Sequence, residues 1–285
     1  MRAAFAFLVC TLLLAPDAAA RSRVVRVRPS IERVFLVILE NQDADVALRR
    51  PFVQRLVAGG GLLANYHCIT HPSQPNYIAL AAGSTWGVKD DTTANLDVPH
   101  LGDLFDARGM SWKVYAERYP GGCFLASSAD NLLYVRRHVP FLGFTNVQKN
   151  SARCAAHIVN ATLLDADIAS HALPAYSMYI PDQQHNGHDS DVDTADAWLA
   201  SRFGSLLNDP RFMEGTLFIL TYDESASSNT RVATVFYGAG VKRGSTSVRF
   251  YDHYDLLRTI EELLHVPTLG QEDLKQGERI TDVFQ

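Results

Sequence analysis

The sequence is poor in cysteine and carries no surplus of positive charge. It has 285 residues with only 4 cysteines, and no two of them have the C-x-x-C spacing of a cysteine-ligated metal site. The 31 acidic residues outnumber the 26 basic ones, and the resulting net charge of −5 argues against nucleic-acid binding as the main role. Low-complexity tracts and internal repeats are also lacking. The apolar fraction of 47% supports a full core, enough for one large domain or two small ones.

Long apolar runs are confined to the N-terminus. Residues 1–20 combine an Arg near the start, an apolar run and the small-residue exit AAA, which is the pattern of a secretory signal peptide cleaved before Arg21. The alternative, a membrane anchor, is disfavoured because the run from Ala3 to Ala15 is too short to span a bilayer. We therefore expect a secreted or periplasmic protein with no stable membrane anchor.

Three cysteines remain after cleavage, which is an odd number for an oxidising compartment. Cys123 and Cys154 lie in loop-like surroundings (YPGGC and NSARC), and we expect them to form a disulfide bond. Cys68 adjoins an apolar, strand-like run and is expected to be buried and free.

Apolar runs and helical patterns alternate along the chain. The runs resemble strands that are buried on both faces, as in a parallel sheet. They are VFLVIL (34–39), LLANY (62–66), WKVYA (112–116), AYSMYI (175–180), TLFILTY (216–222) and VATVFYG (232–238). Helical patterns lie between them, the last one (252–265) opening with Asp252 as a candidate N-cap. The predicted fold is α/β, a three-layer sandwich with a mainly parallel central sheet and helices on both faces. Residues 118–155 are expected to form a long excursion over the sheet.

Acidic residues follow three of the expected strands. Glu40-Asn41 follows 34–39, Asp182 lies just after 175–180, and Asp223-Glu224 follows 216–222. In an open α/β sheet, ligands bind beyond the carboxyl ends of the strands, so these acids would meet at one point and repel unless a cation lies among them. Oxygen ligands favour Mg²⁺, Ca²⁺ or Mn²⁺, although Zn²⁺ and Fe also fit. The alternative is that acids and Asn simply form turns and caps after strands.

A serine lies between two prolines in HPSQPNY (71–77). Ser73 precedes an expected helix that begins near Pro75 or Asn76, and a helix N-terminus favours an anion. A hydroxyl held there beside a cation would suit a nucleophile. A serine in this position would equally suit a helix cap, and the spacing alone does not choose between the two.

Two short polar clusters contain histidines. His138 lies in the basic segment YVRRHVPF, whereas His185 and His188 lie in DQQHNGHD, where Asp182 or Asp189 can orient an imidazole. We regard His138 and His188 as candidate active-site residues. A tight turn capped by Asp is the structural alternative for the NGHD segment.

Six sequence blocks in order carry a family resemblance. They are EN (40–41), HPSQPNYIALAAGS (71–84), RRHVPF (136–141), PDQQHNGHD (181–189), TYDE (221–224) and DHYDLLRTIEELL (252–264). Together they resemble the phosphoesterase family that includes secreted acid phosphatases and bacterial phospholipases C, within the alkaline-phosphatase-like superfamily. HVPF replaces the usual HNPF-like segment, so no role of that Asn carries over.

The resemblance implies a single phosphoesterase domain over residues 21–285 that hydrolyses phosphate esters through one divalent metal ion. It assigns Ser73 as the nucleophile and His138 and His188 as residues that contact the phosphoryl group or serve the leaving group. Asn76 and Asn186 are the expected substrate-binding residues. The implied metal ligands are Glu40, Asn41, Asp223 and Glu224.

Three classes of function therefore compete. A phosphomonoesterase of the acid-phosphatase type, acting through a phosphoserine, is favoured, with a phosphodiesterase or phospholipase C as the near alternative. An acyl hydrolase built on Ser73, His188 and Asp182 would lack the G-x-S-x-G elbow and leave the strand-end acids without a role. The third class is an exported protein that binds a ligand without chemistry.

Overall fold

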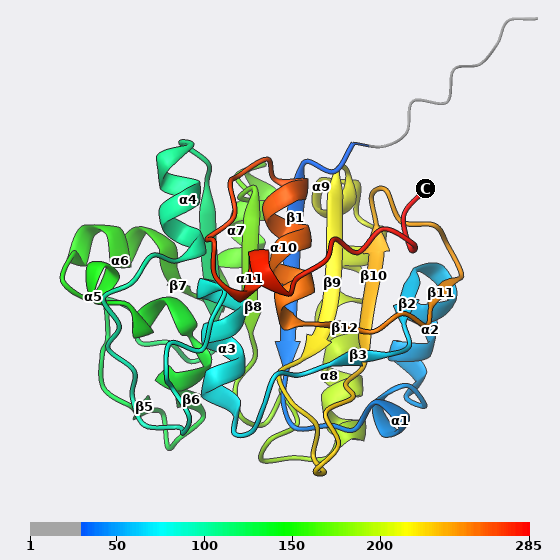
Figure 1. Ribbon diagram of the computed structural model, residues 1–285, viewed down its shortest axis with the longest axis horizontal. Helices are drawn as coiled ribbons and strands as arrows, with labels where there is room; N and C mark the ends of the chain where they lie inside the picture. The colour runs from blue at the N-terminus through cyan, green and yellow to red at the C-terminus, as the bar shows by residue number, and fades with distance from the viewer. Residues whose placement is uncertain (1–29) are drawn as a thin grey trace, which may run out of the picture.

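A central sheet of eight strands organises the computed structural model, which describes residues 30–285 (Figure 1). The strand order is β11-β2-β10-β9-β1-β8-β4-β7. From β9 to β7 each neighbouring pair is parallel, and β10 is antiparallel to both of its neighbours. The strands are β1 (Arg33–Leu39), β2 (Gly61–Leu63), β4 (Trp112–Ala116), β7 (Ile158–Asn160), β8 (Tyr176–Ile180), β9 (Thr216–Tyr222), β10 (Thr234–Gly238) and β11 (Ser245–Ser247). The predicted α/β fold with a mainly parallel sheet is confirmed.

Helices cover both faces of this sheet. In Figure 1, α3 and α10 lie in front of the sheet and contact each other, whereas α8 lies behind it and contacts α2. The α-helices are α1 (Ala44–Ala47), α2 (Pro51–Gly59), α3 (Ser73–Ala82), α4 (Leu101–Ala107), α5 (Thr145–Gln148), α6 (Ser151–His157), α7 (Leu164–Ala169), α8 (Val192–Phe203), α9 (Pro210–Met213), α10 (His253–Leu263) and α11 (Glu272–Lys275). The short 3₁₀ helices are η1 (Arg136–His138), η2 (Pro140–Gly143), η3 (Ala161–Leu163) and η4 (Leu206–Asn208).

Strands β1 and β9 form the buried centre of the sheet. All residues of β9, and all of β1 except Arg33, are buried, as expected for strands covered by helices on both faces. The two strands are in register along their whole length, and Leu39 pairs with Tyr222 at their ends. Glu40 and Asp223 therefore leave the sheet side by side, at its lower edge in Figure 1.

Two expected elements differ in detail. The strand expected over 62–66 is broken: β2 joins the central sheet, whereas β3 (Tyr66–His67) pairs with β12 (Tyr251–Asp252) in a separate two-stranded sheet. The helix expected from Pro75 or Asn76 begins at Ser73, because Pro72 is its extended N-cap and Pro75 lies in the first turn, where a missing N–H costs nothing. Asp252 caps α10 as predicted, accepting from the backbone N–H groups of Tyr254 (2.8 Å) and Asp255 (3.2 Å).

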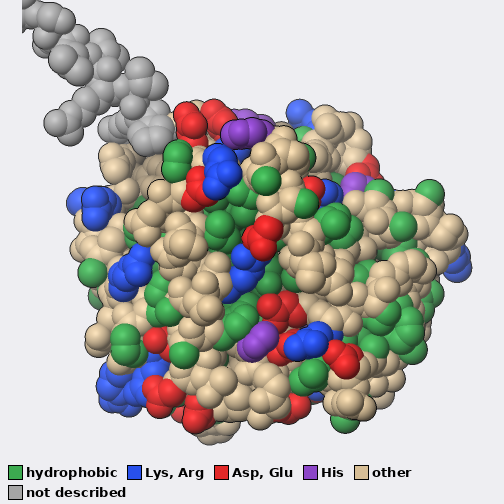
Figure 2. Space-filling model, turned by 180° about the vertical axis from the view of Figure 1, so that it is seen from behind, with side chains coloured by type: hydrophobic (Ala, Val, Ile, Leu, Met, Phe, Trp, Pro, Cys, Tyr) green, Lys and Arg blue, Asp and Glu red, His purple; other side chains and the backbone are tan. Residues whose placement is uncertain are grey.

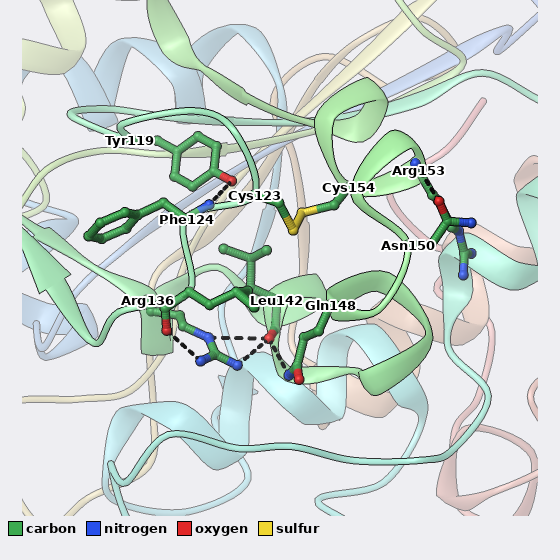
Figure 3. The surroundings of a disulfide bond; sticks show 10 residues. Tyr119, Cys123, Phe124, Arg136, Leu142, Gln148, Asn150, Arg153 and Cys154 are labelled. Carbon is green, nitrogen blue, oxygen red and sulfur yellow. Dashed lines mark hydrogen bonds between the residues drawn. A yellow bond between two sulfur atoms is a disulfide. The ribbon is translucent and has the colours of Figure 1, made fainter.

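The excursion after β4 is tied down covalently and by hydrogen bonds (Figure 3). A disulfide joins Cys123 to Cys154, as predicted, and Cys68 is buried and free. The buried Arg136 guanidinium donates to the carbonyl groups of Leu125 (2.7 Å) and Leu142 (2.7 Å). The segment contains a small hairpin of β5 (Ser128–Ala129) and β6 (Tyr134–Val135). These ties fix η1, which carries His138.

Residues 30–285 were compared with what a membrane span or a patch of one charge sign would require. Helices long and apolar enough to cross a membrane do not occur in this part of the chain. On the face opposite to that of Figure 1, acidic and basic side chains are interspersed (Figure 2). The expected signal peptide (1–20) and the basic segment after it lie outside the described residues.

A buried pair of acids lies behind the C-terminus of α3. Glu261 of α10 and Asp273 of α11 are both fully buried, and Glu261 Oε2 has no hydrogen-bond partner within residues 30–285. Asp273 packs against Gly83, the left-handed cap of α3 (φ 68°), where a Cβ would come within 2.5 Å of Asp273 Oδ1. Burial, together with the Asp273 charge, raises the pKa of Glu261 from 4.5 to about 8, and Arg258 opposes this shift.

The raised pKa of Glu261 predicts that the stability of the protein depends on pH. In the unfolded chain Glu261 titrates near 4.5, so the folded state binds the extra proton between pH 4.5 and about 8. The free energy of unfolding should therefore fall as pH rises through this window and level off above it, by roughly 2–4 kcal/mol from this group. Replacing Glu261→Gln should flatten the fall, measured by urea unfolding at pH 5 and pH 9.

Glu262→Gln is the matched control for this prediction. Glu262 is the next residue on α10, but it is half-exposed and pairs with Arg279 at the surface (2.6 Å). Its replacement should leave the difference between pH 5 and pH 9 unchanged. Equal pH dependence in wild-type protein and Glu261→Gln would contradict the assignment.

Candidate active site

Ser73 lies in the first turn of α3 and faces the ends of β1 and β9. The N-cap of α3 is Pro72, so Ser73 is not at the capping position and the cap alternative does not apply. Ser73 Oγ instead lies 3.0 Å from both Glu40 Oε2 and Glu224 Oε1. A hydroxyl has one proton, so it can donate to only one of these oxygens at a time. The other contact is favourable only when a carboxyl group holds a proton or a cation shields the oxygens.

Three buried acids surround this hydroxyl, and burial raises the pKa of each. The pKa of Glu40 is raised by burial and then by the Asp223 charge, and that of Glu224 chiefly by burial. Burial, followed by the Glu224 charge, raises the pKa of Asp223 to about 8. Like charges in a low-dielectric site shift in this way unless an opposite charge compensates them.

The unpaired oxygens of this cluster fit a cation. Asn41 Oδ1 and Asp223 Oδ2 are buried and have no hydrogen-bond partner among the described residues. The other Asp223 oxygen, Oδ1, accepts from the backbone N–H of Asn41 at 3.2 Å, which leaves Oδ2 free. A buried carboxylate oxygen and an amide oxygen without donors are suitable ligands for a hard divalent ion. Glu40 and Glu224 are the other two oxygen ligands that the sequence predicts for this ion.

The two predicted histidines lie beside the same cluster. His138, from η1, is buried, stacks on Tyr77 at 5.1 Å between ring centroids, and has its Nε2 3.4 Å from Glu40 Oε1. Burial, with Arg137 and His188 nearby, lowers the pKa of His138 well below its usual value. The rings of His138 and His188 are 6.3 Å apart. His188 is partly exposed, and its Nδ1 lies 2.6 Å from Asp189 Oδ1, one of the two predicted partners.

The predicted substrate-binding residues hold loops in place. Asn76 Oδ1 accepts from the backbone N–H groups of Ile69 (2.9 Å) and Thr70 (3.2 Å). Its Nδ2 donates to the carbonyl groups of Thr70 (2.8 Å) and Pro72 (3.2 Å). Asn186 Oδ1 accepts from the His188 backbone N–H (2.8 Å), and the Asn186 backbone carbonyl accepts from the Glu40 N–H (3.0 Å). Both amides thus fix the backbone that carries the candidate site.

Several residues at this site were missed at the sequence level. Tyr77 donates to Glu40, and His71 pairs with Glu224; both belong to the same HPSQPNY segment as Ser73. Asp91 accepts from the backbone N–H of Gln74 at 3.0 Å, so a carboxylate already lies at the N-terminus of α3. The position of His71 and Tyr77 beside Ser73 was a signal that could have been used. Asp91 lies in a loop that carries no pattern.

A second cluster follows β4 and β8. The ligand atoms of Glu117, Asp182 and His185 lie within 4.8 Å of one another. Their carboxylate oxygens already have donors: Glu117 accepts from Tyr179 (2.9 Å) and the Asp182 N–H (3.0 Å), and Asp182 accepts from Arg118 (3.1 Å). This cluster is therefore a hydrogen-bonded support for the 181–189 turn.

The Ser-His-Asp arrangement considered for an acyl hydrolase does not form. Ser73 contacts two carboxylates, His188 pairs with Asp189, and Asp182 pairs with Arg118. A serine activated by an imidazole needs the two in hydrogen-bond contact, with the acid behind the imidazole.

A family model of the "Phosphoesterase family" matches residues 47–267. The chain belongs to the Phosphoesterase family. The match covers most of the described chain, from the last residue of α1 to just beyond α10, and contains five of the six sequence blocks; EN (40–41) precedes it. The family resemblance is confirmed.

Two relatives show how far the similarity extends. A probable acid phosphatase of Kluyveromyces lactis is 33% identical over 90% of this chain, which spans only 65% of the yeast protein. A phosphatidylinositol-3-phosphatase of Mycobacterium tuberculosis is 31% identical over 90% of this chain and 84% of its own length. Two solved structures have the same fold. The lipoteichoic acid synthase LtaP of Listeria monocytogenes superposes with a TM-score of 0.62 at 11% identity, and the superposition covers 86% of this chain and 76% of the LtaP chain. A Vibrio parahaemolyticus protein of the alkaline phosphatase superfamily superposes with a TM-score of 0.59 at 11% identity, over 90% of this chain and 72% of the Vibrio chain. The fold is that of this superfamily.

The bonds of Asn76 predict a loss of stability on its removal. Replacing Asn76→Ala leaves two backbone N–H groups and two carbonyl groups of the 69–72 loop without their partner, at a cost of about 2–4 kcal/mol. Asn76→Asp keeps the acceptor but sets a buried carboxyl group against the Thr70 and Pro72 carbonyl oxygens, so it should also be less stable than wild type. Urea unfolding measures all three. Unfolding of Asn76→Ala at the wild-type free energy would contradict this anchoring role.

Proposed function

We propose that this protein is an exported, metal-dependent hydrolase of phosphoric esters that acts on phosphomonoesters through a phosphoserine at Ser73. The observation that carries the proposal is the position of Ser73 Oγ, 3.0 Å from two acids at the ends of β1 and β9. The names of the relatives, acid phosphatase and phosphatidylinositol-3-phosphatase, support this class of reaction. Residues 21–285 would act as one phosphoesterase domain. A phosphodiesterase or phospholipase C at the same site is the alternative.

One divalent metal ion is part of the proposal. Its ligands would be Glu40, Asn41, Asp223 and Glu224, whose unpaired or repelling oxygens favour it. Bound there, the ion supplies charge neutralisation for the serine alkoxide and the phosphoryl oxygens.

The chain's own residues supply the remaining steps. Glu40 or Glu224, each 3.0 Å from Ser73 Oγ, would accept the hydroxyl proton as Oγ bonds to phosphorus and the bond from phosphorus to the departing alcohol breaks. His188 is partly exposed and is oriented by Asp189, so it is suited to protonate the departing alcohol. His138 is the other candidate for this step. Asn76 and Asn186 hold the loops around the phosphoryl group, and any contact of theirs with substrate is a prediction of the family resemblance. Water then cleaves the phosphoserine.

Export is supported by two features of the chain. The first 20 residues have the pattern of a signal peptide, and Cys123 and Cys154 form a disulfide, which persists in oxidising compartments.

Replacing Ser73→Ala tests the nucleophile. The variant should lose turnover of p-nitrophenyl phosphate by roughly 10³-fold or more, because covalent attack is lost. Ser177→Ala is a matched control: Ser177 is a fully buried serine near the start of β8, away from the carboxyl ends of the strands, and its variant should keep wild-type turnover. Near-normal turnover by Ser73→Ala would refute the assignment. No hydrolysis by the wild-type protein across phosphomonoesters, phosphodiesters and phospholipids would favour a binding protein.

Metal removal tests the cofactor. Dialysis against EDTA should abolish turnover, because the buried acids then hold protons or repel, and addition of one of Mg²⁺, Ca²⁺, Mn²⁺, Zn²⁺ or Fe²⁺ should restore it. Elemental analysis of the dialysed protein is the control. Full activity in a sample free of metal would exclude a metal-dependent reaction. Preference for bis-p-nitrophenyl phosphate or phosphatidylcholine over the monoester would favour the diesterase or phospholipase alternative.

A further inference from the structure

A buried histidine connects the small β3–β12 sheet to the candidate metal site. His253 begins α10 directly after β12 and is fully buried. Its Nε2 lies 2.7 Å from the backbone carbonyl oxygen of Asp223, and its Nδ1 lies 2.9 Å from the Tyr66 hydroxyl. A carbonyl oxygen only accepts, so Nε2 carries the proton and donates. In a neutral ring Nδ1 then accepts from the Tyr66 hydroxyl. The hydrogen bonds therefore run in one direction: Tyr66 donates to His253, and His253 donates to the Asp223 carbonyl.

These hydrogen bonds end on the peptide group that joins two candidate metal ligands, Asp223 and Glu224. The carbonyl of Asp223 and the N–H of Glu224 belong to one planar peptide unit, so a bond to the carbonyl orients the backbone of both residues. The Asp223 N–H donates to the Leu39 carbonyl (2.9 Å), and Asp223 Oδ1 accepts from the Asn41 N–H (3.2 Å). With these three bonds made, Oδ2 is the one oxygen of Asp223 that is buried and unpaired.

We propose that Tyr66 and His253 are positioning residues that hold the Asp223–Glu224 peptide so that the free Asp223 oxygen faces the metal, and that they thereby set the metal affinity. The proposal rests on the metal site put forward above and adds two residues to it. Neither side chain is a ligand, since both ring nitrogens of His253 are engaged and the Tyr66 hydroxyl is bound to one of them. Partners of this kind behind a metal ligand typically contribute about 10–100-fold to affinity.

The structure offers matched controls for both residues. His100 is also fully buried, with Nδ1 accepting from the Gly102 N–H (3.1 Å) and Nε2 3.0 Å from Asn146 Oδ1, but it caps α4. Tyr251 is the β-sheet partner of Tyr66, is equally buried, and donates to Asp282 (2.9 Å). Replacing these two residues costs buried hydrogen bonds of the same kind without touching Asp223.

The test measures dissociation constants of Mn²⁺, Zn²⁺ and Ca²⁺ for EDTA-treated protein by competition with a fluorescent chelator. His253→Ala should bind at least one of these ions about 10–100-fold more weakly than wild type. His253→Gln can still donate to the Asp223 carbonyl, so it should recover most of this loss. Tyr66→Phe should weaken binding by a smaller factor. His100→Gln and Tyr251→Phe should bind with wild-type affinity.

A double variant separates positioning from general destabilisation. If His253 acts through Asp223, His253→Ala should add little further loss to Asp223→Asn, so the two effects on affinity are not additive. Wild-type affinity in both His253→Ala and Tyr66→Phe overturns the inference, as does an equal loss in the His100 and Tyr251 variants. If His253→Ala does not fold, Tyr66→Phe is compared with its control Tyr251→Phe, and wild-type affinity in Tyr66→Phe then overturns the inference. Absence of binding of these three ions, and also of Mg²⁺ and Fe²⁺, to the wild-type protein overturns the proposed metal site itself, together with the inference.

Discussion

Three buried carboxyl groups share the space around one serine hydroxyl, and most features of the site follow from the cost of that arrangement. Glu40, Asp223 and Glu224 are all removed from water, and ionised carboxylates without compensation are expensive in such surroundings. The chain meets this cost in part with donors, such as Tyr77 and the Asn41 N–H. The donors do not suffice, because Asp223 Oδ2 remains unpaired and the pKa of each acid is raised. A cation at this point removes both problems at once.

The rest of the fold keeps these acids from moving apart. The register of β1 with β9 brings Glu40 and Asp223 to one edge, and both strands lie in the buried centre of the sheet. Asn76 fixes the 69–72 loop ahead of Ser73, and the Asn186 carbonyl fixes the Glu40 backbone. A repelling cluster can persist in a native structure only when the surrounding backbone is determined by many other contacts. The hydrogen-bonded loops and the buried sheet supply those contacts here.

The sequence predicted the parts of this arrangement that follow from local chemistry. Apolar runs predicted β1, β4, β8 and β9 closely, because a strand buried on both faces needs apolar residues at every position. The strand-end acids were predictable because parallel strands end at the same edge. The break after Leu63 was not, since β2 and β3 differ in their pairing partners rather than in their composition. The start of α3 was placed two or three residues late, because the role of Pro72 as N-cap depends on its backbone angles.

Contacts between distant segments account for the site residues that the sequence did not reveal. Asp91 lies in a loop and His253 in a helix, and the sequence around each of them is accounted for by local structure alone. Tyr66 is an aromatic residue of a type common in strands. Ser73 and the acids lie on the sheet edge and the helix start, where the backbone is rigid. His138 lies on the excursion tied by the disulfide, and His188 on the 181–189 turn. Loops of this kind vary more readily than the scaffold that carries them. The residues expected to bind the metal are therefore built into the scaffold, whereas those expected to serve the leaving group lie on loops that are linked to Glu40 through the Asn186 carbonyl and the ring of Tyr77.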